Sequence, residues 1–238
     1  MTSLLLMGHG SPSPASRREL LELRELVGER LGRPVAVGVL EFPAPELPPL
    51  ARAFALLGGT ARVAAQPLVL FEGLHGRHDM PGEAAAAARQ LGLEVRLGTP
   101  LGHDAVLIDL ALGRLAGAGP VEGDVLLFVG RGSSVAESLR QTDEVACLVA
   151  AGAGLPHVVC HAGISKPDPV EGVRLASREA QRVIVLPWLI HTGVLADRVR
   201  ELTAATAQDC GVECLQLPHI GNGPELVGLL ANRLEALL

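Results

Sequence analysis

The sequence of this chain has very few aromatic side chains and no excess of positive charge. It contains no tyrosine, one tryptophan and four phenylalanines, and its formal net charge is −6. Lys166 is the single lysine, so nearly all the basic residues are arginines. Non-specific nucleic-acid binding needs a basic surface, and binding of single strands also needs aromatic rings for stacking. We therefore expect no nucleic-acid partner.

Cysteine pairs and long apolar runs are also missing. The four cysteines contain no CxxC pair, which argues against a disulfide framework or a structural zinc site, although Cys210 and Cys214 remain alternative metal ligands. No apolar run reaches the roughly 18 residues of a membrane span. The apolar start is short and lacks a basic flank, so it does not resemble a signal peptide. We expect a cytoplasmic protein with reduced cysteines and no membrane association.

What the chain does contain is a large apolar fraction, 48%, and an informative beginning. The run Leu4–Met7 stops at Gly8-His9-Gly10-Ser11, which is typical of a buried parallel strand followed by a tight turn. A helix is predicted for residues 17–31, where apolar residues form one stripe. His9 is thus expected at the carboxyl end of a strand, where open α/β sheets bind their ligands.

The rest of the first half repeats this alternation of strands and helices. Further strands are predicted over 35–41, 62–71 and 93–97, and further helices over 48–57, 82–91 and 105–115. This order implies a parallel sheet covered by helices on both faces. Residues 116–123, rich in glycine, are interpreted as a linker.

After the linker the same pattern begins again. Gly130-Arg131-Gly132-Ser133 matches Gly8-His9-Gly10-Ser11 at an offset of 122, and Pro187 matches Pro67 at an offset of 120. These anchors predict two homologous halves, residues 1–119 and 120–238. The expected fold class is α/β, with two tandem flavodoxin-like domains, each a parallel sheet flanked by helices, facing one another across a cleft.

The two halves differ in their polar residues. Arg131 falls opposite His9, and Leu195 falls opposite His75. His161 falls near the position of Glu41, with an ambiguous gap between them. We therefore assign the chemistry to the first half.

Polar side chains follow three predicted strands of the first half, namely His9, Glu41, His75 and His78. Loops at the carboxyl ends of parallel strands converge on one edge of the sheet. Two imidazoles and a carboxylate suit a divalent transition metal, and the same groups can move protons near neutral pH. The alternatives are that the histidines are ordinary surface residues and that Glu41 caps the next helix. His103 and His219, which have no partner pattern, are interpreted as structural.

Other motif classes are absent or incomplete. There is no Walker A motif, no complete dinucleotide fingerprint and no GxSxG elbow. Ser11 as a nucleophile beside His9 lacks a third orienting group. The loop from Gly130 to Ser134 can bind an anion, because glycine amides, serines and Arg131 meet there.

Together these motifs resemble those of the class II tetrapyrrole chelatases. The resemblance rests on three segments in order: Leu6–Ser11 (Leu-Met-Gly-His-Gly-Ser), Leu40-Glu41, and Pro67–Pro81 (Pro-Leu-Val-Leu-Phe-Glu-Gly-Leu-His-Gly-Arg-His-Asp-Met-Pro). The segment Leu186–Leu195 is similar to the family's second repeat, which lacks the histidine pair. Within the family, the chain is most similar to the two-repeat (CbiX/SirB-like) sirohydrochlorin cobaltochelatases and ferrochelatases. Pro12-Ser13-Pro14, Leu74 and His78 depart from the pattern.

The resemblance implies insertion of Co²⁺ or Fe²⁺ into sirohydrochlorin, with cobalt favoured, in cobalamin or sirohaem biosynthesis. It implies that His9 and His75 bind the metal and that Glu41 is the catalytic acidic residue. Ser11 and Arg131 are expected to bind the polycarboxylate substrate, with Arg77 and Arg198 as further candidates. The metal ion (Co²⁺, Fe²⁺ or Ni²⁺) is a substrate, and no permanently bound cofactor is expected.

Two other functions stay open at this point. A protein of the same fold can carry a metal or bind a tetrapyrrole without turnover, and the glycine-rich loops are compatible with a phosphate-ester enzyme. The second half is expected to be a degenerate repeat that completes the cleft. The protein is expected to be a monomer or a homodimer.

Overall fold

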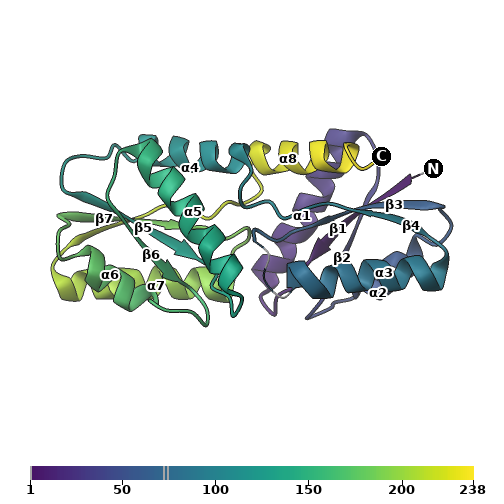
Figure 1. Ribbon diagram of the computed structural model, residues 1–238, viewed down its shortest axis with the longest axis horizontal. Helices are drawn as coiled ribbons and strands as arrows, with labels where there is room; N and C mark the ends of the chain where they lie inside the picture. Colours follow the sequence, from purple (N-terminus) through teal and green to yellow (C-terminus); the bar gives the residue numbers. More distant parts are fainter. Residues whose placement is uncertain (1, 72, 74) are drawn as a thin grey trace. The chain divides into compact units, whose positions relative to one another are not determined.

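The computed structural model describes residues 2–71, 73 and 75–238 (Figure 1). Strands and helices alternate throughout, as the apolar pattern predicts. The strands are β1 (Thr2–Gly8), β2 (Val35–Val39), β3 (Arg62–Pro67), β4 (Glu94–Leu97), β5 (Asp124–Gly130), β6 (His157–His161), β7 (Arg182–Pro187) and β8 (Glu213–Gln216). The α-helices are α1 (Pro14–Leu31), α2 (Leu50–Leu56), α3 (Met80–Leu91), α4 (Ala105–Gly117), α5 (Ala136–Ala153), α6 (Pro169–Ala176), α7 (Val194–Cys210) and α8 (Pro224–Glu235). A π-helical turn, η1 (His75–Asp79), precedes α3.

The strands form two parallel sheets of four. Their orders are β2-β1-β3-β4 and β6-β5-β7-β8. In the first sheet β1 lies between β2 and β3, pairing Gly8 with Val39 and Met7 with Pro67. This confirms the predicted α/β class with two parallel sheets.

The core of the first sheet follows from the alternation of side chains along a strand. Leu5 and Met7 of β1 face one cluster, which Phe54 of α2 and Met80 of α3 complete. The neighbouring β1 residues Leu4 and Leu6 are equally buried, at 2% and 0% exposure. Both faces of β1 are therefore covered, which explains why its sequence is a continuous apolar run rather than an alternating one.

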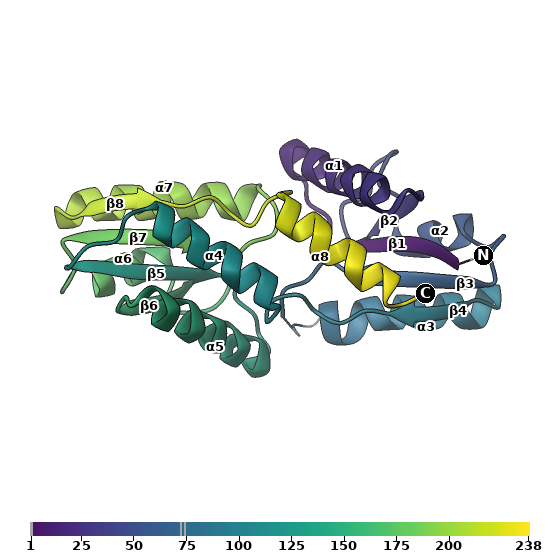
Figure 2. The same ribbon diagram turned by 90° about the horizontal axis from the view of Figure 1, so that it is seen from above.

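The last helix of each repeat packs in the other compact unit. Unit 1 comprises residues 1–101 and 222–238, and unit 2 comprises residues 102–221. Helix α8, from the second repeat, lies beside α1 and contacts β3 in unit 1 (Figure 2). Helix α4, from the first repeat, contacts α5 in unit 2. The compact units therefore differ from the repeats at 1–119 and 120–238 by one exchanged helix each.

Polar contacts fix the exchanged helices in place. At the start of the α8 segment, the Nδ2 of Asn222 donates to the carbonyl oxygen of Glu19 at 2.7 Å and to Oε2 of Glu22 at 2.9 Å. In unit 2, the Arg114 guanidinium of α4 donates to three consecutive carbonyl oxygens, of Pro218, His219 and Ile220, at 2.7–2.9 Å. A single arginine thus ties α4 to the segment that follows β8.

Most predicted boundaries in the first half lie within two residues of those in the structure, and two differ by more. Helix α1 begins at Pro14 rather than at residue 17, because the Ser13 side chain accepts from the Ser16 amide and Pro14 occupies the first turn. Strand β3 ends at Pro67 rather than Phe71. Within the described residues, no helix is both long and apolar enough to cross a membrane.

Candidate functional site

The loops after β1 and β2 are joined by backbone hydrogen bonds. The amide of Leu40 donates to the carbonyl of Gly8 at 3.1 Å, and the amide of Glu41 donates to the carbonyl of His9 at 2.8 Å. The structure therefore holds His9 and Glu41 side by side at the carboxyl edge of the first sheet, as predicted. Glu41 does not cap the next helix, since the N-cap of α2 is Pro49.

Gly10 makes this close approach sterically allowed. Its φ is +93°, and a Cβ built on it would lie 1.9 Å from the carbonyl oxygen of Glu41. Any side chain at position 10 would therefore push the Glu41 loop away from His9. The glycine after His9 is explained by this contact.

The His9 ring is oriented by a backbone carbonyl. Its Nδ1 lies 3.1 Å from the carbonyl oxygen of Gly10, and the side chain is half-buried. A carbonyl oxygen only accepts, so Nδ1 carries the hydrogen, and Nε2 carries the lone pair of the neutral ring. Metal-binding histidines in proteins are commonly oriented in this way.

The neighbouring strand β3 leads to the second predicted metal ligand. The Leu68 amide donates to the carbonyl of Met7 at 2.8 Å, which continues the β1–β3 pairing to the same edge of the sheet. His75 opens the π-helical turn η1, a local structure that is frequent at functional sites. The side chain of His75 and the whole of Leu74 lie outside the described part of the structure.

The other residues predicted for this edge are Ser11, which makes a local hydrogen bond, and Arg77 and His78, which are exposed. Ser11 Oγ accepts from the Ser13 amide at 3.1 Å, so this serine stabilises the turn before α1. His78 and Arg77 are exposed on η1. Among the side chains that the structure describes, which exclude His75, no three histidine, cysteine, aspartate or glutamate residues form a metal-binding group.

The second sheet repeats the backbone of this edge with other side chains. The Ala162 amide donates to the Gly130 carbonyl at 2.8 Å, and the Gly163 amide donates to the Arg131 carbonyl at 2.9 Å. Arg131 thus takes the place of His9, as the sequence comparison predicts, and its side chain is exposed. The place of Glu41 is taken by Gly163.

This register corrects the approximate match between His161 and Glu41. Gly130 pairs with His161 as Gly8 pairs with Val39, so His161 occupies the place of Val39. Its side chain is 4% exposed, and burial lowers its pKa, against the opposing effect of Asp143. His161 is therefore a buried residue at the end of β6, two positions before Gly163, which takes the place of Glu41.

In the predicted anion-binding loop around Arg131, part of the backbone is already hydrogen-bonded to another side chain of the protein. The Ser133 amide donates to Ser165 Oγ at 2.9 Å, and Ser165 Oγ donates back to the Ser133 carbonyl at 2.9 Å. An amide already bonded in this way is not available to a ligand. The Ser133 amide is therefore no part of an anion site in this loop.

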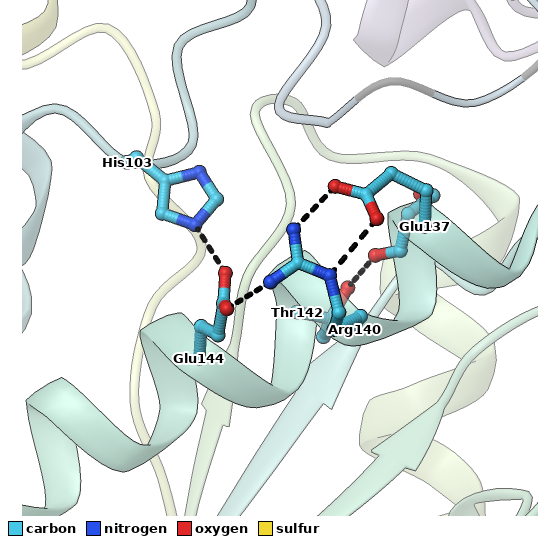
Figure 3. A network of polar contacts seen from close by, with 6 residues as sticks. His103, Glu137, Arg140, Thr142 and Glu144 are labelled. Atoms are coloured by element: carbon cyan, nitrogen blue, oxygen red, sulfur yellow. Dashed lines mark hydrogen bonds and ion pairs between the residues drawn. The ribbon is translucent and has the colours of Figure 1, made fainter.

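The histidine interpreted as structural, His103, belongs to a surface network in unit 2. Its Nε2 lies 3.4 Å from Oε2 of Glu144 on α5, and Arg140 contacts both Glu144 and Glu137 (Figure 3). These side chains are 32–57% exposed, so each pair contributes little to stability. His219 contributes a carbonyl to the Arg114 side chain.

The four cysteines belong to no group of three metal-ligating side chains within the described residues. All four are free, and Cys210 is exposed while Cys214 is half-buried. Burial raises the pKa of the Cys160 thiol to about 12, so it stays protonated at neutral pH.

A surface hollow at the start of β5 is a poorer candidate for a site. It lies between the linker residue Pro120 and Pro156, at the amino ends of the strands. Its buried carboxylate, Asp124, is already paired with the Arg182 guanidinium, which lowers the pKa of Asp124. The edge that carries His9 and Glu41 is the better supported site.

Comparison with known proteins places these observations in a family. The CbiX family model matches residues 3–118 and again residues 125–237. A sirohydrochlorin ferrochelatase of Priestia megaterium is 28% identical over 244 residues, covering 100% of this chain and 91% of that protein. A sirohydrochlorin cobaltochelatase of Methanocaldococcus jannaschii is 37% identical over 82 residues, covering 34% of this chain and 57% of that protein.

A solved structure has the same fold. The sirohydrochlorin chelatase SirB from Bacillus subtilis subspecies spizizenii, determined in complex with cobalt, superimposes with a TM-score of 0.81. It is 23% identical and covers 99% of this chain and 94% of its own. Because the family model matches both repeats and almost their full length, the chain belongs to the CbiX family.

Proposed function

We propose that this protein is a sirohydrochlorin chelatase, which inserts Co²⁺ or Fe²⁺ into the metal-free macrocycle. The observation that carries the proposal is the edge of the first sheet. There the Gly10 carbonyl directs the lone pair of His9 to Nε2, and the Glu41 backbone is bonded to that of His9. The named activities of the family relatives support the same reaction.

The proposed chemistry uses these side chains in separate roles. His9 and His75 hold the incoming ion through neutral imidazole nitrogens and leave its other positions open to the four pyrrolic nitrogens. Insertion releases two pyrrole protons, and the exposed Glu41 carboxylate accepts them one at a time, passing each to water before it takes the next. The metal ion is consumed as a substrate.

We further propose that the first repeat supplies the catalytic groups and the second a substrate-binding edge. In the second sheet the matching positions hold Arg131 and Gly163, which have no imidazole or carboxylate. The exposed guanidinium of Arg131 suits the carboxylates of the substrate. Ser11 is assigned to the substrate-binding edge of the first sheet.

Cobalt is proposed as the preferred metal. A site of two imidazoles binds Co²⁺ more tightly than Fe²⁺ by the usual order of stability. Relatives named for each metal are known, and those that match along the whole chain include ferrochelatases. Insertion rates for both metals under matched conditions therefore decide this part of the proposal.

The experiment is an insertion assay followed by the absorption spectrum of sirohydrochlorin. Purified protein is mixed with sirohydrochlorin and Co²⁺, Fe²⁺ or Ni²⁺ in parallel, under anaerobic conditions for iron. We expect a rate well above that of the protein-free mixture, fastest with Co²⁺. A protein that binds both metal and macrocycle without exceeding the protein-free rate would be a carrier, and the proposal would be wrong.

A further inference from the structure

The chain has five aromatic residues, and only one of them is largely exposed. Phe54, Phe128 and Trp188 are fully buried, at 0%, 0% and 1% exposure. Phe71 is half-buried. Phe42 is 47% exposed and directly follows Glu41 at the edge of the first sheet.

The backbone of Phe42 is strained. Its φ is +51°, and within the described residues it is the only position other than glycine with a positive φ. Bulky side chains rarely adopt this conformation, so the surroundings must impose it. Strain of this kind is concentrated at functional sites.

The contacts that impose this conformation lie on both sides of Phe42. Before it, the Glu41 amide is bonded to the His9 carbonyl at 2.8 Å. After it, Ala44 and Leu47 exchange two backbone hydrogen bonds of 3.0 Å, and the Leu47 side chain is buried at 1% exposure. The loop is thus fixed at both ends, and the aromatic ring between them stays exposed to water.

The second unit has an exposed apolar residue at the matching position. Ile164 follows Gly163 as Phe42 follows Glu41, and it is 79% exposed. The neighbouring residues are replaced between the two edges, whereas the exposed apolar side chain is kept. Single exposed apolar side chains are common on protein surfaces. The recurrence of one at the matched position of both edges, in unit 1 on a strained backbone beside Glu41, points to a ligand with an apolar surface.

We propose that the ring of Phe42 contacts the macrocycle of the substrate while His9 holds the metal. The inference rests on the proposed function and extends it by naming a substrate-contact residue. A tetrapyrrole has a flat conjugated centre, and an exposed aromatic side chain one residue after Glu41, whose amide is bonded to the His9 carbonyl, can pack against it. The carboxylates at the macrocycle's periphery need other partners, such as Arg131.

The test separates binding of the macrocycle from binding of the metal. Metal-free sirohydrochlorin is titrated into wild type and Phe42→Ala, and KM is measured separately for sirohydrochlorin and for Co²⁺. We expect Phe42→Ala to weaken sirohydrochlorin binding and to raise its KM by about 3- to 10-fold, the effect of one aromatic contact. The KM for Co²⁺ should change less than twofold, and Phe42→Leu should show an intermediate loss.

Two further variants control for shape and for general surface effects. Phe42→Gly accepts the positive φ without strain, so the loop keeps its shape and binding should fall as far as in Phe42→Ala. Leu56→Ala removes an apolar side chain that is 69% exposed on α2 of the same unit, and it should bind sirohydrochlorin like wild type.

Two results would overturn the inference: sirohydrochlorin affinity of Phe42→Ala within twofold of wild type, with an unchanged circular dichroism spectrum, or full binding by Phe42→Gly. Because the titration needs no turnover, it tests Phe42 even if the wild type inserts no metal. In that case the proposed function alone is wrong. A wild type that does not bind sirohydrochlorin overturns both.

Discussion

The edges of the two sheets have nearly the same backbone, but they differ in the side chains that can take part in chemistry. In both, two amides of the loop after the second strand donate to the two carbonyls at the end of the first. The residues placed by these bonds are His9 and Glu41 in unit 1, but Arg131 and Gly163 in unit 2. The backbone bonds maintain the fold of each edge, whereas the side chains are free to diverge with its role.

The loops after β2 and β6 also differ between the two units. The amide of Val39 bonds to Pro48, nine positions later, while the amide of His161 bonds to Pro167, six positions later. The loop of unit 1 is thus three residues longer, and it contains the strained Phe42. A longer loop leaves room for residues that bind a ligand rather than support the fold.

The largest expected effect comes from removing either of the two proposed metal ligands of unit 1, His9 and His75. His9→Ala and His75→Ala should each abolish metal insertion, because we propose that both imidazoles belong to one metal site. The double variant should therefore lose no more than each single one. Insertion rates, with circular dichroism as the folding control, measure this.

Two neighbouring histidines serve as controls for that prediction. His78→Ala should retain most of the activity, since His78 is exposed on η1, and His103→Ala should be active because His103 contacts Glu144 in unit 2. Near-normal insertion by folded His9→Ala or His75→Ala would rule out a shared metal site. A loss in His78→Ala as deep as in His75→Ala would make His78 a ligand.

The next effect compares the matched glycines after His9 and Arg131. Alanine at either position is strained by about 1–3 kcal/mol, because φ is +93° at Gly10 and +85° at Gly132. Gly10→Ala also places Cβ 1.9 Å from the Glu41 carbonyl oxygen, whereas the nearest atom to a Cβ at Gly132 is 3.2 Å away. Gly10→Ala should therefore lower the free energy of unfolding more, and should also lower the insertion rate.

Urea denaturation of both glycine variants tests this difference. Gly132→Ala is the control, because it introduces a similar backbone strain without a contact between its Cβ and a backbone carbonyl. Equal stability and equal activity of the two variants would show that the His9–Glu41 contact does not depend on Gly10.

Arg131→Ala should have a smaller effect of a different kind. Loss of one charged contact of about 1.5–3 kcal/mol should raise the KM for sirohydrochlorin by about 10- to 150-fold. The turnover number should stay close to that of wild type, since Arg131 takes the place of His9 without its imidazole. Steady-state kinetics at constant ionic strength measure both values, and lost turnover at unchanged KM would contradict the assignment of the second edge.

The smallest effect concerns His161, which occupies the place of Val39. Burial lowers the pKa of folded His161 below the unfolded value of about 6.5, so the unfolded chain binds more protons in that window. The contribution of neutral His161 to the free energy of unfolding is fully present above about pH 6.5. It is lost as the pH falls towards the pKa of the folded state, because the unfolded chain takes up the proton first. His161→Val, which carries the residue of unit 1, should lose less stability than wild type between pH 7.5 and 5.5.

Urea midpoints at the two pH values give this comparison directly. The other titrating groups are common to both proteins, so their contributions cancel in the difference. Identical pH dependence of the wild type and His161→Val would contradict the buried, neutral state of His161.

The arrangement of the first edge could be predicted because it depends on local patterns. The run Leu4–Met7, the glycines around His9 and the order of elements were enough to place His9 at the carboxyl end of a buried parallel strand, and a flavodoxin-like order would place that strand beside the third one, as the structure does. Ser13-Pro14, noted as a departure from the family pattern, is the cap and first turn of α1. Its capping role is readable from sequence, because serine and proline are common at these two positions.

Other features could not be predicted from sequence. His161 was matched only approximately, because the three-residue difference in loop length falls just after it. The positive φ of Phe42 lies between the Glu41–His9 and Ala44–Leu47 backbone bonds, and the first of these joins segments distant in sequence, so no local signal encodes it. The exchange of α4 and α8 leaves no trace in the pattern, because an apolar stripe does not specify which sheet it covers.

The exchanged helices have a consequence for how such a chain can be divided. Leu226, Leu230 and Leu234 of α8 are fully buried in unit 1, each contributing about 1.5–3 kcal/mol by burial. A fragment ending after the first repeat therefore exposes the sheet face that α8 covers, and its own α4 lacks the α5 surface on which it packs. Two separate copies of one repeat can regain both contacts by exchanging their last helices. Because the two repeats are covalently joined in this chain, the exchange is intramolecular and does not depend on protein concentration.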